Sequence, residues 1–323
     1  MPINALAQLT PKAPLEQITL PDFPPAGAGM VDVDVIHCSV CHSDVHLLDG
    51  DWGEVSRPLV PGHEIVGRTR DGRLVGIGWQ AGSCGKCRMC TTENEHLCTD
   101  GKVKTCMNRP GGFASRVRVH EKFCFDVPPS LDPAVASPLL CAGLTTFSPL
   151  ERLRVGPGTR VGIVGFGGLG HVAVQFARAL GAKVIAFDPD PSKRELATKL
   201  GAEDLVDTKG PLPERAVDVL LVTTHANLDW DAWMRVVDLE GSLCLVGVPS
   251  TSITVHPDYL LDHQKQITGS VIGSPGTMRR MLSFAAEHGV APIIERMPMA
   301  RANEAIDRVR AGQARMRIVL DVT

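Results

Sequence analysis

The segment CSVCHSDVH, residues 38–46, concentrates side chains that bind metals or transfer protons. It holds two cysteines, two histidines and an aspartate within nine positions. The spacer of about a dozen residues that separates the ligand pairs of a zinc finger is absent. Four ligands so close in sequence cannot all reach one tetrahedral centre. The segment must therefore share its chemistry with residues elsewhere in the chain.

A second group of cysteines has a regular spacing. Cys84, Cys87, Cys90 and Cys98 form the pattern C-x2-C-x2-C-x7-C in a loop rich in glycine and charge. Four thiolates close a tetrahedral shell and leave no open position, which is typical of structural zinc sites. An iron–sulfur cluster is the alternative, because it also takes thiolates. Disulfides fit poorly in a cytosolic protein.

Further ligand-type residues stand in separate segments. PGHEIVG contains His63 beside Glu64, and SPLLCAG contains Cys141. In isolation, His63 or Cys141 is more often a packed core residue than a metal ligand. Together with Cys41 they would supply three ligands and leave a fourth position for water or substrate, as catalytic zinc sites do. Sequence spacing alone does not show that these segments meet in the folded protein.

A glycine-rich turn indicates nucleotide binding. Its pattern, G-x-G-x-x-G, contains Gly165, Gly167, Gly168, Leu169 and Gly170. Glycines at this spacing alone indicate only a tight turn. Here the turn follows the apolar run TRVGIV and opens the helical pattern HVAVQFARALGA. Its amides and the helix N-terminus can therefore face a pyrophosphate.

Asp188 ends the next apolar run, AKVIAFD, 18 residues after Gly170. A carboxylate at this place accepts hydrogen bonds from the ribose hydroxyls and repels a 2′-phosphate, which favours NAD over NADP. Lys193 and Arg194 follow and would instead cradle a phosphate. NADP therefore stays open as the alternative cofactor.

The elements that must position these residues predict an α/β protein. A length of 323 residues suggests two domains. Residues 1–143 combine short β-type runs with proline, glycine and cysteine, which indicates a mostly β domain. Residues 144–272 alternate strand-type and helix-type segments, which predicts a doubly wound parallel Rossmann sheet. Residues 273–323 contain two helical patterns and the strand-type run MRIVLDV.

The composition excludes several classes of partner. The chain has 44% hydrophobic and 21% charged residues, as average soluble proteins do. A net charge of −3 without a dense basic run argues against nucleic acid and membrane surfaces. No signal peptide is evident, and no run approaches the roughly 18 apolar residues of a spanning helix. We expect a cytoplasmic protein with a small-molecule substrate.

Taken together, these motifs resemble the zinc-dependent medium-chain alcohol dehydrogenases, closest to the cinnamyl alcohol dehydrogenase-like branch. The resemblance rests on CHSDVH, LLDGDWG, PLVPGHEIVG, VGIGW, the four-cysteine lobe, GGFASRVRV, GLGHVAVQFARALGA and GSPGT, and it covers nearly the whole chain. It implies that residues 273–323 return to a GroES-like catalytic domain formed by residues 1–143. It also implies two zinc ions per chain, NAD or NADP, and a homodimer or homotetramer.

The resemblance assigns roles to matching residues. Cys41, His63 and Cys141 would bind the catalytic zinc, with Glu64 as a transient ligand. Asp44 would orient the zinc-bound imidazole. Ser43 would contact the substrate oxygen and His46 would continue the proton relay. The cofactor would contact His42, Thr145, Val246, Gly247, Val248 and Ser274, and Trp52 is either a wall of the substrate pocket or an ordinary packed aromatic.

The implied reaction is reversible hydride transfer between a primary alcohol or aldehyde and NAD(H), with zinc as Lewis acid. Alternatives with the same fold are an NADP-dependent aldehyde reductase and a secondary alcohol or polyol dehydrogenase. A different class is a catalytically silent nucleotide-binding or redox-sensing zinc protein, against which the complete ligand and relay set argues. The connection RTRDGRLVGIG is shorter than usual in this family, which leaves the substrate range open.

The remaining cysteines have less obvious roles. Cys38, Cys124 and Cys244 lie in strand-like runs and are expected to be small core residues. Cys106 follows the four-cysteine lobe but is not assigned as a ligand, because that lobe already has four thiolates.

Overall fold

The computed structural model describes residues 2–322, which form two compact units. The first unit runs to Cys141, resumes over Gly273–Glu287 and continues from Ala291. The second comprises Ala142–Ile272 and His288–Val290. The C-terminal segment thus belongs mainly to the first unit, although the second lies between them in sequence.

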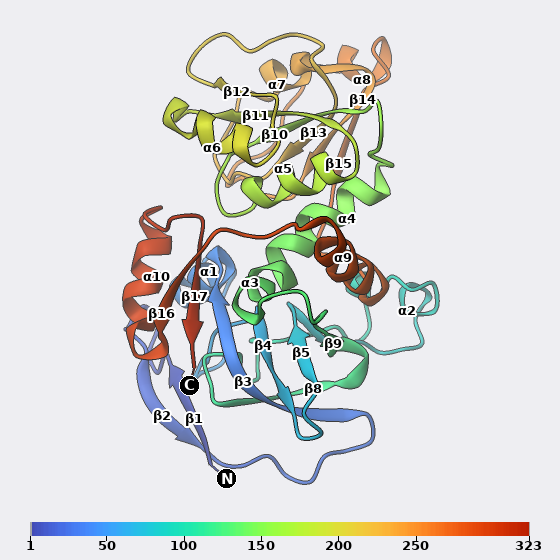
Figure 1. Cartoon of the computed structure of the whole chain (residues 1–323). Helices are drawn as coiled ribbons and strands as arrows, with labels where there is room; N and C mark the ends of the chain where they lie inside the picture. The colour runs from blue at the N-terminus through green and yellow to red at the C-terminus, as the bar shows by residue number, and fades with distance from the viewer. Residues whose placement is uncertain (1, 323) are drawn as a thin grey trace. The chain divides into compact units, whose positions relative to one another are not determined.

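A seven-stranded sheet is the centre of the first unit. Its order is β16-β17-β3-β4-β5-β9, with β8 paired to β3. The strands are β16 (Ile294–Pro298), β17 (Arg317–Asp321), β3 (Met30–Val40), β4 (Ile65–Thr69), β5 (Leu74–Ile77), β9 (Phe125–Asp126) and β8 (Arg116–His120). Figure 1 shows the long blue strand β3 between β4 and the red strand β17. The final strand of the chain therefore joins the sheet that carries the N-terminal ligand motifs.

Alternation along β3 determines which of its faces is buried. Val33 and Val35 are buried in the core, whereas Asp32 and Asp34 point the other way. Each aspartate stands opposite an arginine of β8, and Arg116 Nε donates to Asp34 Oδ1 at 2.9 Å. Opposite charges on facing strands support this register.

The other elements of the first unit surround this sheet. Two short pairs are formed by β1 (Ile3–Ala7) with β2 (Glu16–Leu20) and β6 (Gln80–Gly82) with β7 (Val103–Lys104). The helices are α1 (His42–Asp49), α2 (Arg88–Thr91), α3 (Pro133–Pro138), α9 (Pro275–His288) and α10 (Ala302–Arg310), with 3-10 turns η1 (Glu95–Leu97), η2 (Glu121–Phe123) and η5 (Met299–Arg301).

The second unit contains a six-stranded parallel sheet, which confirms the predicted Rossmann architecture. Its order is β12-β11-β10-β13-β14-β15. The strands are β10 (Arg160–Val164), β11 (Lys183–Asp188), β12 (Asp204–Asp207), β13 (Val217–Val222), β14 (Val237–Leu245) and β15 (Gln266–Gly269). The order reverses between β10 and β13, the point at which doubly wound sheets bind nucleotides.

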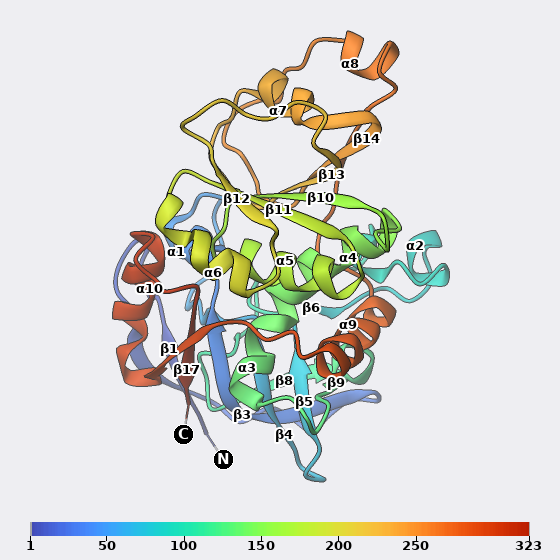
Figure 2. The ribbon, with the colours of Figure 1, turned by 45° about the horizontal axis from the view of Figure 1, so that its top comes forward.

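Helices cover both faces of this sheet. Figures 1 and 2 place α5 (Gly170–Ala179) and α6 (Arg194–Lys199) on one face and α7 (Trp230–Val236) on the other. The remaining helices are α4 (Leu144–Arg152), α8 (Asp258–Leu261) and the turn η4 (Pro191–Lys193). The ring of Trp233 packs 5.3 Å from that of Phe187, between centroids. This contact joins α7 to the strand β11.

One segment differs from its predicted structure. The run LDWDAWMRVVDL fits a helix by sequence pattern, but α7 ends at Val236 and β14 begins at Val237. Val237 pairs with Val217 of β13 in the parallel ladder. Val236 and Val237, both β-branched, thus lie where the helix changes to a strand. Pairing of Val237 in the parallel ladder overrides the helical pattern of the sequence.

The expectation that no run approaches the roughly 18 apolar residues of a membrane-spanning helix is contradicted by one stretch. Within the described residues, Pro133–Arg152 forms a stretch of 20 helical residues, and an 18-residue window of it has a mean hydropathy of 1.2. A π-helical turn, η3 (Leu139–Gly143), joins α3 to α4 and makes the stretch continuous. Because 72% of that window is buried inside the protein, the stretch has the properties of a core helix.

Candidate functional site

Three separate segments of the first unit bring ligand-type side chains together. Cys41 lies between β3 and α1, His63 and Glu64 directly precede β4, and Cys141 lies in the π-helical turn η3. Their ligand atoms all lie within 4.8 Å of one another. The fold thus brings together residues that spacing alone could not connect.

The imidazole of His63 fits a metal ligand. The ring is fully buried, and Nδ1 lies 3.1 Å from Asp44 Oδ1. The other nitrogen, Nε2, is buried without a hydrogen-bond partner in the described chain. Two thiols, an imidazole nitrogen and a nearby carboxylate form a donor set suited to zinc.

The ligand side chains strongly shift one another's proton affinities. A hydrogen bond with Cys141 lowers the pKa of Cys41 well below the usual thiol value, and the same contact raises the pKa of Cys141. Burial lowers the pKa of His63, but the charges of Asp44 and Cys141 outweigh it and raise that pKa well above its usual value. Buried groups that share protons in this way release them when a divalent cation binds.

Asp44 connects two of the ligand segments. Its Oδ2 accepts the backbone N–H of Cys41 at 2.9 Å, and its Oδ1 accepts that of Gly62 at 2.9 Å. Gly62 has a φ of +99°. A Cβ atom there would lie 2.7 Å from Phe113 Cδ1, so a larger residue would displace the backbone that presents His63.

Glu64 forms a buried ion pair behind the ligand cluster. Its carboxylate contacts the guanidinium of Arg317, from β17, and the hydroxyl of Ser39, from β3. Ser137 Oγ donates to the backbone oxygen of Glu64 at 2.7 Å and accepts from Ser39 N at 2.9 Å. Burial raises the pKa of Glu64 to about 7, although Arg317 opposes this effect.

Sequence reasoning missed the role of Arg317 as partner of Glu64. The only signal in the sequence is a charged residue inside the apolar run MRIVLDV. A buried arginine in a strand requires an anionic partner.

Cys106 was also missed as a neighbour of this site. Its thiol does not join the four-cysteine lobe but lies with Asp44 and His63, with ligand atoms within 4.8 Å of one another. Burial raises the pKa of Cys106, which favours the neutral thiol. Cys38, Cys124 and Cys244 are buried, as expected of small core residues.

An aromatic row extends from the ligand cluster to the surface. The ring of Trp79 packs edge-on against that of His63, with centroids 4.7 Å apart. The ring centroid of Trp52 lies 6.0 Å from that of Trp79, and Trp52 is 42% exposed. Trp79 lies two residues after the end of β5. It is a candidate for the pocket wall that sequence reasoning missed.

The structure does not join the predicted relay residues directly. Ser43 and His46 lie on α1, and no hydrogen bond connects them in the described chain. Instead, His46 Nδ1 lies 2.6 Å from Asp51 Oδ2, near the exposed end of α1. The ring of His42 lies edge-on to that of His46, with centroids 4.9 Å apart.

The four-cysteine lobe has the dimensions of a single metal centre. The sulfur atoms of Cys84 and Cys90 are 3.8 Å apart, those of Cys87 and Cys90 3.6 Å, and those of Cys87 and Cys98 3.9 Å. Four sulfurs around one zinc ion lie about 3.8 Å apart, because the Zn–S bond is about 2.3 Å. All four cysteines are free of disulfides, and this spacing leaves room for one ion rather than a cluster.

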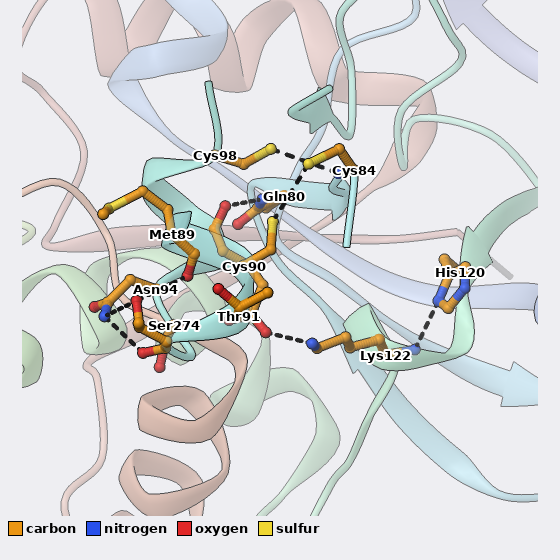
Figure 3. A network of polar contacts seen from close by, with 12 residues as sticks. Gln80, Cys84, Met89, Cys90, Thr91, Asn94, Cys98, His120, Lys122 and Ser274 are labelled. Carbon is orange, nitrogen blue, oxygen red and sulfur yellow. Dashed lines mark hydrogen bonds and ion pairs between the residues drawn. The ribbon is translucent and has the colours of Figure 1, made fainter. Parts of the chain in front are cut away.

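Backbone amides support the thiolates of this lobe. The N–H of Cys90 leads the effects that lower the pKa of Cys87 to about 6, and the N–H of Cys84 leads those that lower the pKa of Cys98. Gln80 Nε2 donates to the backbone oxygen of Glu95 at 2.7 Å, and Lys122 forms an ion pair with the carboxylate of Glu95. Figure 3 shows Gln80 and Lys122 in the polar network around Cys84, Cys90 and Cys98. These contacts attach the lobe to β6 and to η2.

The glycine turn of the second unit has the form expected of a pyrophosphate site. Gly165 has a φ of +89°, and a Cβ on Gly170 would lie 1.8 Å from Gly165 O. A Cβ on Gly167 would meet no atom within 4 Å, so this glycine leaves space open above the turn. These properties match the separate functions of the three glycines in dinucleotide-binding turns.

Asp188 is buried at the end of β11 and contacts this turn. Its Oδ2 accepts the N–H of Phe166 at 2.7 Å. Its Oδ1 accepts the N–H of Asp190 and lies 3.0 Å from Lys193 Nζ. The ammonium group of Lys193 therefore balances the negative charge of the Asp188 carboxylate.

The other predicted cofactor contacts lie in different units. Thr145, on α4, and the loop Val246–Val248, after β14, belong to the second unit. In this loop Gly247 approaches Thr224 so closely that a Cβ would lie 2.1 Å from Thr224 O, while Val248 is 66% exposed. Ser274 belongs to the first unit, where its Oγ accepts the N–H of Thr277 at 3.2 Å.

Comparisons with known proteins agree with this geometry. Residues 27–129 match the alcohol dehydrogenase GroES-like domain, and residues 168–287 match the zinc-binding dehydrogenase domain. The chain is 39% identical over 312 residues to the probable formaldehyde dehydrogenase AdhA of Bacillus subtilis, covering 90% of this chain and 89% of that protein. The chain belongs to the zinc-dependent medium-chain alcohol dehydrogenases.

Solved structures of this family are similar over the full chain. A cinnamyl alcohol dehydrogenase from Sorghum bicolor has a TM-score of 0.92 and 31% identity, over 99% of this chain and 98% of that one. CAD from Helicobacter pylori, complexed with NADP(H), has a TM-score of 0.90 and 28% identity, over the same shares.

Membership of this family confirms the expected class of enzyme and its cofactors. The protein is an alcohol dehydrogenase that uses zinc and NAD(P), with a GroES-like unit and a Rossmann unit. Its reaction is alcohol and aldehyde redox chemistry. The alternative of a catalytically silent zinc protein is therefore set aside.

Proposed function

We propose that this alcohol dehydrogenase interconverts primary alcohols and aldehydes with NAD(H), and that Cys41, His63 and Cys141 hold its catalytic zinc. The observation that carries the proposal is the convergence of these three side chains with Glu64, with ligand atoms within 4.8 Å of one another. The unpartnered Nε2 of buried His63 supports it, because such a nitrogen requires a partner.

The chain's own residues would each have a defined task. Bound zinc supplies Lewis acidity, which lowers the pKa of an alcohol hydroxyl. Asp44 holds the His63 ring in its orientation through Nδ1. Ser43 would receive the substrate proton, and His46, which contacts Asp51, would release it toward solvent. Because no hydrogen bond joins Ser43 to His46 in the described chain, a bridging group must carry the proton between them. Trp52 forms a wall of the substrate pocket.

Glu64 is proposed as a transient ligand rather than a permanent one. Its carboxylate already has two partners, Arg317 and Ser39, in a buried network. Zinc coordination would require it to give up part of these contacts. This competition favours three permanent protein ligands and an open fourth position for substrate.

The four cysteines of the lobe are proposed to hold the second, structural zinc. Their sulfur separations of 3.6–3.9 Å support this assignment. Four thiolates leave no position for substrate, so this ion would stabilise the fold only.

The preference for NAD is proposed on the position of Asp188. A 2′-phosphate beside it would bring two anions together at a buried carboxylate, whereas ribose hydroxyls would donate to it. The NADP(H) complex of the similar Helicobacter pylori protein supports the alternative cofactor, and Lys193 is the residue that would serve it. Further cofactor contacts are proposed for His42, Thr145, Gly165, Gly167, Gly168, Leu169, Gly170, Val246, Gly247, Val248 and Ser274.

A cytoplasmic homodimer or homotetramer completes the proposal. The strand β15 lies at the edge of the parallel sheet, and the nearby Val271 is 49% exposed. An unpaired edge of this kind can continue into a second copy of the chain.

A panel of aliphatic, benzylic and cinnamyl aldehydes, assayed with NADH and NADPH, tests this function. Primary aldehydes should be reduced faster than ketones, and NADH should give the higher kcat/KM. Equal or better rates with NADPH would contradict the assignment of Asp188, and turnover of ketones or polyols alone would contradict the substrate class.

A further inference from the structure

A cavity in the first unit contains two arginines that have no carboxylate partner. Its volume is about 250 Å³. Its lining comes from three segments: Leu20 of β2, the segment 56–60 with Ser56 and Arg57, and the segment 108–110 with Asn108 and Arg109, which forms the opposite wall. None of these residues belongs to the ligand clusters of the enzyme.

Arg109 has an uncompensated charge. Among the described residues it donates no side-chain hydrogen bond and forms no ion pair, and its Nε is buried without an acceptor. Burial lowers the pKa of Arg109, and no carboxylate is near enough to offset that effect. A guanidinium carries five N–H donors, so this residue offers a complete, unused fork.

Arg57 is held rigidly in the opposite wall. Its Nη1 donates to Val55 O at 2.9 Å and its Nη2 to Gln8 Oε1 at 2.7 Å. Both acceptors are neutral, and Nε of Arg57 is buried without an acceptor in the described chain. The charge of this second guanidinium is therefore also uncompensated, while its position is fixed.

A hydrogen bond between the two walls adds a further donor. Ser56 Oγ donates to Asn108 Oδ1 at 2.7 Å, which fixes the orientation of the Asn108 amide. The amide NH₂ then has no acceptor in the described chain. The cavity thus presents donors and positive charge from both sides.

We propose that this cavity is an anion-binding site for a phosphate or carboxylate group. Partly buried arginines without counter-charges are costly, and an oxyanion would satisfy both the charge and the planar donor geometry. The volume suits a small anion or the acidic end of a larger molecule.

The site is adjacent in sequence to the catalytic cluster on both walls. Val60 precedes His63 by three residues, and Arg109 follows Cys106 by three residues. The anion is therefore either a free ion or, if the short sequence separation is matched by closeness in space, the acidic group of the substrate itself. Binding of the substrate's acidic group rests on the proposed function, whereas binding of a free ion does not.

Calorimetric titration of the zinc-loaded enzyme with inorganic phosphate tests the site. Saturating NAD is present so that the pyrophosphate site is filled. Wild-type enzyme should bind phosphate saturably, and Arg109→Gln should weaken binding at least about tenfold, the lower range for a hydrogen bond to a charged group. Arg109→Lys, which keeps the charge, should weaken it less. Arg70→Gln, at an exposed arginine of the same unit, should match wild type.

Two outcomes would overturn the proposal: absence of saturable phosphate binding, or equal binding by wild type and Arg109→Gln with both proteins folded by thermal melting. If phosphate binds at the catalytic zinc instead of this cavity, wild type and Arg109→Gln would bind it equally. If Arg109→Gln does not fold, Arg57→Gln must show the loss of phosphate binding instead, and equal binding by folded Arg57→Gln and wild type overturns the proposal.

Kinetics distinguish the two sources of the anion. With 4-carboxybenzaldehyde and benzaldehyde as substrates, Arg109→Gln should raise KM for the carboxylated aldehyde alone if the site holds the substrate's acidic group. Equal KM changes for both aldehydes, together with lost phosphate binding, would assign the site to a free anion.

Discussion

The carboxylate of Asp44 lies 3.1 Å from Nδ1 of His63, with both side chains fully buried. The same carboxylate accepts the backbone N–H groups of Cys41 and Gly62. One side chain thus orients the ring of one proposed zinc ligand and positions the backbone of another, although Asp44 itself lies outside the proposed ligand set Cys41, His63 and Cys141.

Asp44→Asn should weaken zinc binding at the catalytic site by about 10–100-fold, the usual cost of losing an outer-shell carboxylate. Asparagine offers a single acceptor oxygen, so its NH₂ group would face one of the three donors. Competition with a chelator measures the zinc affinity. Asp49→Asn, at the exposed end of the same helix, should leave it unchanged, and equal affinity in both variants would contradict this role.

The Glu64–Arg317 pair should be strongly coupled. Arg317→Met leaves a buried carboxylate without its counter-charge, which costs about 3–5 kcal/mol. The double variant Arg317→Met/Glu64→Gln should regain part of the lost melting temperature, because it removes the charge as well. The exposed pair of Arg296 and Asp321 gives the control: Arg296→Met should have little effect. Additive losses in the double variant would refute the coupling.

Asp188 should control the choice of cofactor. Asp188→Ser removes the acceptor for the ribose hydroxyls and should lower kcat/KM for NADH by about 10–100-fold, since hydrogen bonds to a charged group are worth about 1.5–3 kcal/mol. Activity with NADPH should hold or rise, because Lys193 is released from its ion pair. Asp190→Ser is the matched control, two residues further along. An unchanged NADH/NADPH ratio in Asp188→Ser would rule out this assignment.

His37 should make the protein less stable in acid. Burial lowers the pKa of His37, although Asp321, at 2.9 Å, opposes this effect. The unfolded chain takes up a proton near a pKa of about 6.5, whereas the folded protein does so only at lower pH. The stability contributed by neutral His37 is therefore complete above about pH 6.5 and is lost as the pH falls below that value.

His37→Gln should therefore flatten the fall in melting temperature between about pH 7.5 and pH 5.5. The exposed His256 provides the control, since His256→Gln should leave the wild-type fall unchanged. An equal fall in His37→Gln and wild type would show that other groups dominate in this range.

The Rossmann unit could be predicted from the sequence because its signals are local. Apolar runs, a glycine turn and an acidic strand end all lie within a few dozen residues, and the alternation of strands and helices predicts a parallel sheet covered on both faces. The end of α7 at Val236 was not predictable, since the pairing of Val237 with Val217 depends on tertiary structure.

The site in the first unit depended on contacts between distant segments. Resemblance to a family identified Cys41, His63 and Cys141, but periodicity could not bring them together. Arg317 lies 253 residues after Glu64 and was missed for this reason. Trp79 and Cys106 were missed likewise, because each is an ordinary apolar residue until the fold places it beside His63.

The direct test of the central claim is the zinc content of wild-type enzyme and of His63→Ala, measured together with NADH binding and turnover. The wild type should hold two zinc ions per chain, one at Cys41, His63 and Cys141 and one in the four-cysteine lobe. His63→Ala should keep the zinc of the four-cysteine lobe, bind NADH and lose turnover. Two zinc ions in His63→Ala, or turnover equal to wild type, would contradict the assignment of the catalytic centre.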